Sequence, residues 1–186
     1  GNLKELFNYD VSFSFQKQVR SVEDYQYRIR LDEKFNTQKF DYESRDGFYS
    51  KGSFSNFLNS EKTDFQLGYE ISEINGFASS ISGDFNAENI SKRLGSYDVF
   101  GSTEINMNSK FSFRPGVRIM FSSQFDTQQA ISLSTKYSFT KDFDIRLIAG
   151  TSPRVPNYDE LYSYFVDVNH NVQGNANLNP ENGKSA

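Results

Sequence analysis

Apolar and polar residues alternate strictly along much of this sequence. In residues 61–71, every odd position from Phe65 to Ile71 is apolar, and the even positions between them carry polar side chains or glycine. Successive side chains of a β-strand point to opposite faces, so a period of two predicts strands with one apolar face. We therefore predict about ten strands. The pattern recurs in 9–15, 25–31, 111–121, 131–139 and 143–149, and less regularly near 35–42, 48–58, 77–85 and 97–107.

The register of these strands is also predictable. A slip of one residue would reverse every side chain, so each apolar set must lie on a single side of the sheet. We expect the odd-numbered residues of 61–71, 111–121, 131–139 and 143–149 to share one face.

The spacing of the strands favours a membrane barrel. From Tyr9 to Phe143, nine strand-to-strand intervals average about 15 residues, more than the roughly 8–12 residues typical of a sandwich. A strand that crosses a membrane needs about 9–11 residues. We predict an all-β fold, an antiparallel up-and-down meander that forms part of a large transmembrane β-barrel. A soluble antiparallel sheet with one buried face also alternates, and it remains the alternative, as an interaction domain of a cell-surface protein.

The connections between strands differ in length. Met107–Lys110 and Thr140–Asp142 are short, whereas 86–96 and 122–130 are longer and polar. Membrane barrels have short periplasmic turns and longer extracellular loops. We expect strands up to about residue 151, followed by a long extracellular loop over 152–186.

Composition excludes several classes of function. A net charge of −4 and a pI near 5.1 give no electrostatic basis for binding nucleic acid. Without cysteine there is no disulfide, no cysteine metal site and no thiol nucleophile. No serine nucleophile elbow accompanies the single histidine, so we expect no enzyme. The chain opens on Gly1 without a methionine and ends in a polar run, and we interpret it as one piece of a larger protein.

Three motifs in the second half of the chain resemble those of TonB-dependent outer-membrane receptors. They are Phe-Arg-Pro-Gly-Val-Arg (113–118), Pro-Arg-Val-Pro-Asn-Tyr-Asp-Glu-Leu-Tyr (153–162) and Gly-Asn-Ala-Asn-Leu-Asn-Pro-Glu (174–181). In that family a Phe-Arg-Ala-Pro box, a Glu-Leu-Tyr and an Asn-Pro-Asn-Leu…Pro-Glu box follow in this order. Pro153, Val155 and Ala176 depart from the family residues. The matching positions are Arg154, Pro156, Glu160, Leu161, Tyr162, Asn175, Asn177, Leu178, Pro180 and Glu181.

The resemblance implies a barrel of about 22 strands with a plugged lumen. Members of the family import siderophores, haem, cobalamin or glycans with energy relayed by the TonB complex. We find no plug in this sequence, so residues 1–186 are expected to form a partial barrel. The implied location is the bacterial outer membrane. The implied partners are membrane lipid, a small-molecule nutrient and, through the missing plug region, the TonB complex.

His170 is the only histidine, and it lies in the expected outer loop. Neutral imidazole is a common ligand of iron, so His170 is a candidate axial ligand for transported haem, although an ordinary polar loop residue fits the same position. Tyr162, Tyr164 and Asn169 are further candidate ligand contacts in this loop. We expect no bound metal and no resident cofactor.

Charged and aromatic side chains on the strands have two interpretations each. The arginines on the predicted polar faces either line a ligand path or pair with nearby carboxylates. The tyrosines on the apolar faces form either an aromatic girdle at a membrane interface or a core between two sheets. The arginines are Arg28, Arg30, Arg114, Arg118 and Arg146, their candidate partners Asp24, Asp32, Glu104 and Asp144, and the tyrosines Tyr9, Tyr25, Tyr27, Tyr69, Tyr97 and Tyr137.

Overall fold

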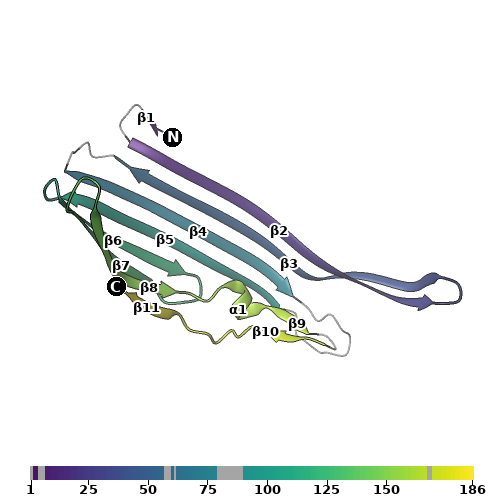
Figure 1. Ribbon diagram of the computed structural model, residues 1–186. Helices are drawn as coiled ribbons and strands as arrows, with labels where there is room; N and C mark the ends of the chain where they lie inside the picture. Colours follow the sequence, from purple (N-terminus) through teal and green to yellow (C-terminus); the bar gives the residue numbers. More distant parts are fainter. Residues whose placement is uncertain (1, 4–6, 57–59, 61, 79–89, 167–168) are drawn as a thin grey trace.

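The computed structural model describes residues 2–3, 7–56, 60, 62–78, 90–166 and 169–186. They form a nine-stranded sheet in the order β1-β2-β3-β4-β5-β6-β7-β8-β11, with every neighbouring pair antiparallel (Figure 1). A separate pair, β9 and β10, and one short helix, α1, lie between β8 and β11 in sequence. The predicted all-β meander is confirmed. The elements are β1 (Asn2–Leu3), β2 (Phe7–Arg28), β3 (Glu33–Ser55), β4 (Thr63–Ala78), β5 (Ile90–Asn106), β6 (Phe111–Ser122), β7 (Gln128–Ser138), β8 (Asp144–Arg154), α1 (Tyr158–Tyr162), β9 (Tyr164–Val166), β10 (Asn171–Gln173) and β11 (Glu181–Ser185).

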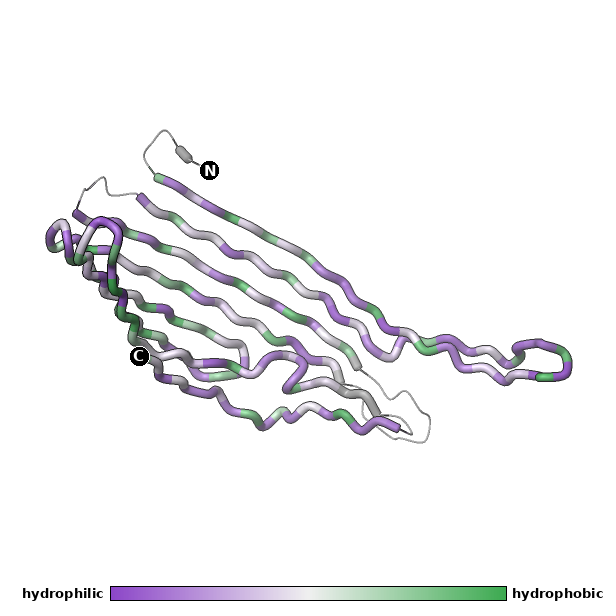
Figure 2. Tube along the Cα trace, viewed as in Figure 1, coloured by the Kyte–Doolittle hydropathy of each residue, from purple (hydrophilic) through white to green (hydrophobic). Residues whose placement is uncertain are grey.

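The predicted register is confirmed across β4 to β8. Tyr69 lies opposite Val99, which lies opposite Ile119, and Val117 lies opposite Ile131. Odd-numbered residues of neighbouring strands therefore share one side, here called the apolar face, and even-numbered residues share the other, the polar face. Figure 2 shows the resulting alternation of hydrophilic and hydrophobic residues along each strand.

The apolar face is not covered by any described part of the chain. Phe13, Leu147 and Ile131 are 80%, 68% and 57% exposed. Among the described residues, the only buried hydrophobic side chains are Tyr42 and three residues of α1. A soluble sheet of this size would bury one face, so the structure does not fit the soluble alternative. The interpretation of the tyrosines as a core between two sheets is likewise wrong.

The first two long strands correct the predicted strand count. The expected strand 9–15 and most of 25–31 belong to one strand, β2, which ends at Arg28. The expected strand 35–42 and residues 48–55 of the next one belong to β3. The polar stretch between them does not end either strand, because backbone pairing of β2 with β3 continues from Asn8↔Ser55 to Arg28↔Glu33, with two register shifts. Pairing of β3 with β4 begins only at Glu43. Residues 21–42 therefore project beyond the sheet as a two-stranded ribbon (Figure 1), which places Tyr25 and Tyr27 outside the sheet.

The connections gather at two ends of the sheet. At the short-turn end lie 107–110 and 139–143, beside the ends of β3 at Ser55 and β4 at Thr63. At the long-loop end lie the ribbon, 123–127 and the described parts of 155–180, beside the ends of β4 at Ala78 and β5 at Ile90. The connection expected over 122–130 is shorter than predicted, because β7 already begins at Gln128. The predicted strand near 77–85 and the first part of the predicted loop 86–96 lie mostly outside the described residues.

The structure of the C-terminal part of the chain also differs from the prediction. Strands were expected to stop at about residue 151, but β8 continues to Arg154. The polar run 181–185 is a strand, β11, paired with β8 from Glu181↔Arg154 to Ser185↔Gly150. Pairing with a preformed neighbouring strand supplies the backbone hydrogen bonds, so this segment needs no apolar face of its own to extend the sheet. The interval between β8 and β11 is 155–180 rather than 152–186.

Candidate functional site at the long-loop end

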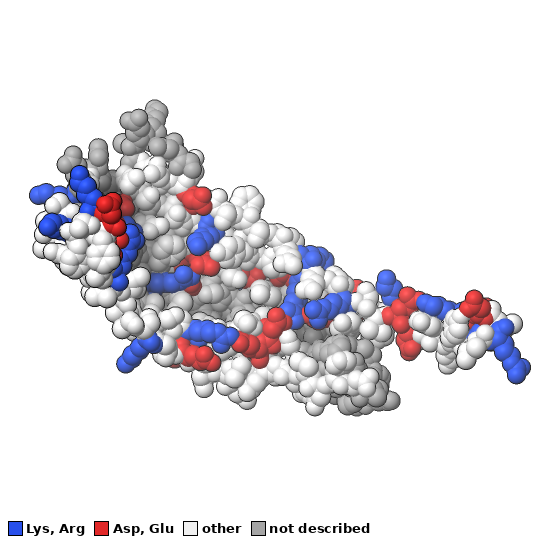
Figure 3. Space-filling view, in the orientation of Figure 1, with Lys and Arg blue, Asp and Glu red and all other residues white. Residues whose placement is uncertain are grey.

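Ion pairs connect neighbouring strands on the polar face. Nη2 of Arg118 lies 2.5 Å from Asp98 Oδ2 and 2.5 Å from Glu70 Oε2. Asp98 and Glu70 are opposite each other in the ladder between β4 and β5. Like charges directly opposite one another are destabilising, and the guanidinium between them offsets that repulsion. Figure 3 shows acidic and basic side chains interspersed on the visible side of the molecule.

The predicted pairings of the arginines are correct in part. Arg114 Nη2 lies 2.7 Å from Glu104 Oε2, and Arg146 Nε lies 3.3 Å from Asp144 Oδ2, as predicted. Arg28 pairs with Glu33 at 3.9 Å instead of Asp24 or Asp32, because the ribbon places β3 beside it. Arg30 lies in the turn at the tip of the ribbon and not on the polar face.

After Arg154 the chain turns into α1 at a capping box. The Asn157 side chain accepts a hydrogen bond from the Glu160 backbone N–H at 2.9 Å, and the Glu160 carboxylate accepts one from the Asn157 N–H at 2.9 Å. This reciprocal arrangement satisfies two backbone donors at the start of the helix. Pro156 precedes the cap, and a residue before or at a helix start tolerates its missing N–H. The motif Pro-Asn-Tyr-Asp-Glu-Leu-Tyr thus encodes a helix start.

Helix α1 lies against the polar face rather than projecting away from the sheet. Tyr158, Leu161 and Tyr162 are buried, with 4%, 2% and 7% exposure, and they contact Ile74, Leu94 and Phe125. A Cβ atom at Gly76 on β4 would overlap the Tyr158 ring, so glycine leaves the space that the ring occupies. The Tyr162 hydroxyl donates to the Gln124 side chain in the connection between β6 and β7.

Arg45 on β3 anchors the helix electrostatically. Its guanidinium forms an ion pair with Asp159 and lies 5.3 Å from the centroid of the Tyr158 ring. On the other side, Arg45 Nη2 lies 2.7 Å from Oε1 of the buried Glu43, which also pairs with Arg20 at 3.0 Å. The Arg45 guanidinium, the Tyr158 ring and the carboxylates of Asp159 and Glu43 together hold α1 to β3.

The second and third family motifs form one folded unit around α1. Arg154 pairs with Glu160, and its Nη1 lies 3.7 Å from Oε2 of Glu181, its register partner on β11. The backbone N–H groups of Gly174 and Asn175 donate to the carbonyls of Ser163 at 2.7 Å and Glu160 at 2.8 Å. Residues far apart in sequence thus cap the same short helix. Here the unit of residues 153–163, 174–175 and 181 is called the motif unit.

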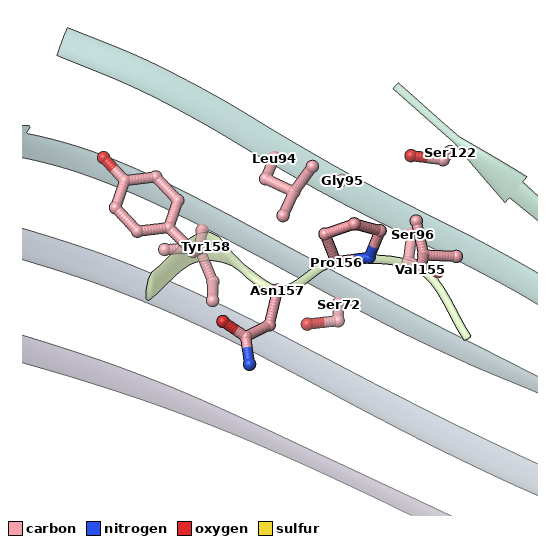
Figure 4. Close-up of a pocket in the computed structure, with 10 residues that line it drawn as sticks. Ser72, Leu94, Gly95, Ser96, Ser122, Val155, Pro156, Asn157 and Tyr158 are labelled. Carbon is pink, nitrogen blue, oxygen red and sulfur yellow. The ribbon is translucent and has the colours of Figure 1, made fainter. Parts of the chain in front are cut away.

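A recess lies between the motif unit and the sheet. It has a volume of about 260 Å³, and Figure 4 shows Pro156, Asn157 and Tyr158 crossing strands that carry Ser72 and Leu94. Ser72, Ser96 and Ser122 occupy opposite positions on β4, β5 and β6 and form a row of hydroxyl groups in it. The Ser96 hydroxyl donates to Asp98 at 2.9 Å, which links the recess to the ion pairs of Arg118.

Two ionisable groups of the motif unit have altered pKa values. The backbone N–H of Asn157 and then the Arg154 guanidinium lower the pKa of Glu160, because both favour its charged form. Burial raises the pKa of the Tyr158 hydroxyl. At neutral pH the unit therefore contains a charged Glu160 and an uncharged Tyr158.

The predicted ligand contacts do not all come together. Tyr162 is buried under the motif unit, so its side chain supports α1 and is not presented to the loop surface. Asn169 and His170 are exposed between β9 and β10. The backbone of Tyr164 pairs with Gln173. Of the remaining family positions, Leu178 is 37% exposed, and the Asn177 N–H donates to the Asn175 side chain at 2.9 Å.

Arg45, Gly76 and the serine row were not anticipated from the sequence. The capping box was readable, because Asn157 is followed by Glu160 three residues later. Arg45 and Gly76 become significant only when β3, β4 and α1 are placed together, so no local pattern indicates them.

Two features are absent from the described residues. These residues contain no group of three or more histidine, aspartate or glutamate side chains that could hold a metal ion. None of their helices is long and apolar enough to cross a membrane.

Comparisons with known proteins agree with this geometry. The family model described as "TonB dependent receptor-like, beta-barrel" matches residues 2–186. Among solved structures, the siderophore receptor PirA from Pseudomonas aeruginosa is similar with a TM-score of 0.60 and 12% sequence identity, over 92% of this chain. At this identity the likeness concerns the fold alone, and the chain covers 35% of that receptor. Among curated proteins, no sequence matches the chain.

Proposed function

Since the chain belongs to the TonB-dependent receptor-like β-barrel family, we propose that it forms part of the wall of an outer-membrane receptor that imports a scarce nutrient. The observation that carries this proposal is the motif unit, which folds onto the polar face at the long-loop end. In a barrel the polar face lines the lumen and the apolar face contacts lipid. The motif unit then lies at the mouth of the lumen, where an entering ligand passes.

The surface chemistry of the sheet supports this orientation. The apolar face consists of exposed aliphatic and aromatic side chains, as a lipid-facing band requires. Aromatic rings cluster at the short-turn end, where the ring centroids of Tyr137 and Phe139 are 4.7 Å apart and those of Phe139 and Phe143 are 5.6 Å apart. Tyr97 and Phe121, which are register partners, lie toward the long-loop end. We assign these two groups to the girdles at the two membrane interfaces, and the short-turn end to the periplasm.

The ligand class that we propose is an iron–siderophore complex, with haem as the alternative. A siderophore receptor has the same fold over this part of the barrel. Haem is the alternative because His170 is exposed in the segment between the motifs. Nothing in the site resembles an activated nucleophile or an acid–base pair for catalysis. Energy for transport would come from the TonB complex through the plug of the receptor.

Cysteine labelling tests the orientation, since the chain has no cysteine of its own. In the whole receptor on intact cells, a membrane-impermeant maleimide should label Val172→Cys in the long loop. The matched variant Asn108→Cys, in a short turn, should react only after the outer membrane is permeabilised. The opposite pattern would contradict the proposed topology.

Uptake tests the transport function. Cells that lack the receptor should lose growth on its ferric siderophore or on haem as sole iron source, and cells that lack TonB should show the same defect. If cells that lack the receptor grow normally on both iron sources, the proposed ligand class is contradicted. Growth that depends on the receptor without TonB would contradict the mechanism of uptake.

A further inference from the structure

The apolar face carries a hollow that the transport function does not use. Its volume is about 480 Å³, and Gly101 of β5 is one of the residues that line it. Its walls are almost entirely hydrocarbon, contributed by four neighbouring strands from β4 to β7. The wall residues are Phe65, Leu67, Thr103, Pro115, Val117 and Ile131.

Two residue types create this hollow. Gly101 places no side chain between its register partners Leu67 and Val117, which are 53% and 47% exposed and stand on either side. Pro115 has no N–H to donate, and the ladder between β5 and β6 is interrupted from Ser102↔Gly116 to Ile105↔Phe113. The hollow is therefore deep at Gly101, where no side chain fills it, and the pairing of β5 with β6 is interrupted beside it.

The register gives the depth of the hollow in the apolar band. On β5 the apolar positions run from Ile105 at the short-turn end to Tyr97 at the long-loop end, and Gly101 is midway. Phe65 and Thr103, which face each other, continue the hollow toward the short-turn end. With the short turns in the periplasm, the hollow extends from the middle of the membrane into its periplasmic half.

We propose that this hollow binds one acyl chain of a phospholipid in the periplasmic leaflet. The proposal rests on the orientation given under the proposed function. The hollow is continuous with the lipid-facing band, and its walls offer a ligand contacts with hydrocarbon but almost no polar partner. A chain seated there fills space that would otherwise leave apolar walls without contacts, since voids forfeit dispersion energy. Its headgroup would remain at the interface marked by the aromatic residues of the short-turn end.

Filling the hollow tests the proposal. In Gly101→Leu the new Cβ lies 3.0 Å from the Leu67 Cδ2 atom and 3.6 Å from the Gln66 carbonyl oxygen. The exposed Leu67 side chain can rotate away, so the strand tolerates the substitution. The added side chain displaces about two methylene groups of the lipid, which lowers its affinity roughly tenfold. Native mass spectrometry of the whole receptor, extracted in mild detergent, measures the retained lipid.

The matched control is Ala149→Leu. Ala149 is exposed on the apolar face opposite Leu133, which in turn lies opposite Pro115, so it sits at the depth of the hollow but outside it. We expect the wild type and Ala149→Leu to retain one phospholipid more than Gly101→Leu. Gly101→Ala, which adds only a methyl group, should be intermediate, and it carries the test if Gly101→Leu does not fold.

Several outcomes overturn the proposal. Equal retention in wild type and Gly101→Leu, or equal loss in Ala149→Leu, means that the hollow holds no specific chain. A retained lipid with the mass of lipid A means that the occupant comes from the other leaflet. Failure of the receptor orientation is distinguishable from these results, because the labelling pattern of Val172→Cys and Asn108→Cys would then be reversed.

Discussion

Leu161 is the most buried of the hydrophobic side chains in the described residues, at 2% exposure. We predict that Leu161→Ala weakens the attachment of α1 to the sheet by about 2–5 kcal/mol, the usual loss for a buried leucine. Hydrogen exchange of the α1 amides in the purified receptor measures this change. Leu178→Ala is the control, because Leu178 belongs to the same family motifs but is 37% exposed, and its effect should be within about 0.5 kcal/mol. Equal effects of the two substitutions would contradict the structural role of α1.

His170 is a single residue that bears on the identity of the ligand and not on the attachment of α1. If the ligand is haem, His170→Ala should abolish an axial bond to iron and impair haem-dependent growth of cells that carry the whole receptor. His170→Gln is the control for polarity without iron ligation. Unchanged haem-dependent growth and unchanged haem binding in both variants would rule out His170 as an axial ligand. The observation that favours haem as the alternative to a siderophore would then be lost.

Residue-scale prediction from sequence succeeded where the chemistry is local. The arginines on the polar faces were expected to pair with a set of carboxylates that includes Glu104 and Asp144, and the structure contains the pairs Arg114–Glu104 and Arg146–Asp144. Tyr162 was expected to contact ligand, but it is buried. Its environment depends on Gln124 and on the strands beneath α1, which a pattern within residues 153–162 cannot reveal.

At the scale of elements, the attachment of α1 should depend on pH through Glu160. Its pKa is lowered in the folded unit, so the stabilisation is present above the unfolded value of about 4.3 and is lost as the pH falls through the folded value. We predict that α1 amides stay protected at neutral pH and lose protection at strongly acidic pH. Hydrogen exchange, corrected for the pH dependence of intrinsic exchange, measures this.

The control for that prediction is Glu160→Gln. The amide side chain can still accept from the Asn157 N–H, but it has no charge to pair with Arg154. The variant should be less protected at neutral pH and should respond less to acid than the wild type. An identical acid response in both proteins would assign the pH dependence to another group.

Strands were predictable where they alternate, and their ends were less so. The turn after β5 was located correctly at Met107–Lys110 because strands end there on both sides. β11 was missed because Glu181–Ser185 has no alternation and depends on β8 for its pairing. The length of β2 and β3 was missed because partner strands, not local composition, keep a polar stretch extended.

At the scale of the whole molecule, the sheet is incomplete in two respects. Its apolar face is exposed across all long strands, and within the described residues the sheet ends at β1 and β11 without closing on itself. A closed barrel removes both features, because lipid covers the apolar face and no strand edge is left. The alternation predicted the face correctly, whereas alternation within single strands carries no signal for closure of the sheet.

We therefore predict that these 186 residues alone, refolded in detergent, bind no ferric siderophore or haem tightly. In the proposed receptor a ligand would be held by loops from around the lumen, and this chain covers only 35% of the related receptor. Losing contacts worth about 2.8 kcal/mol weakens binding a hundredfold, and most of the wall is absent. Isothermal titration of the chain and of the whole receptor with the same ligand measures the difference. We expect the chain to bind at least about a hundredfold more weakly than the whole receptor. Comparable affinity would mean that the motif unit and the loop around His170 form a complete binding site by themselves, without the lumen that the rest of the barrel encloses.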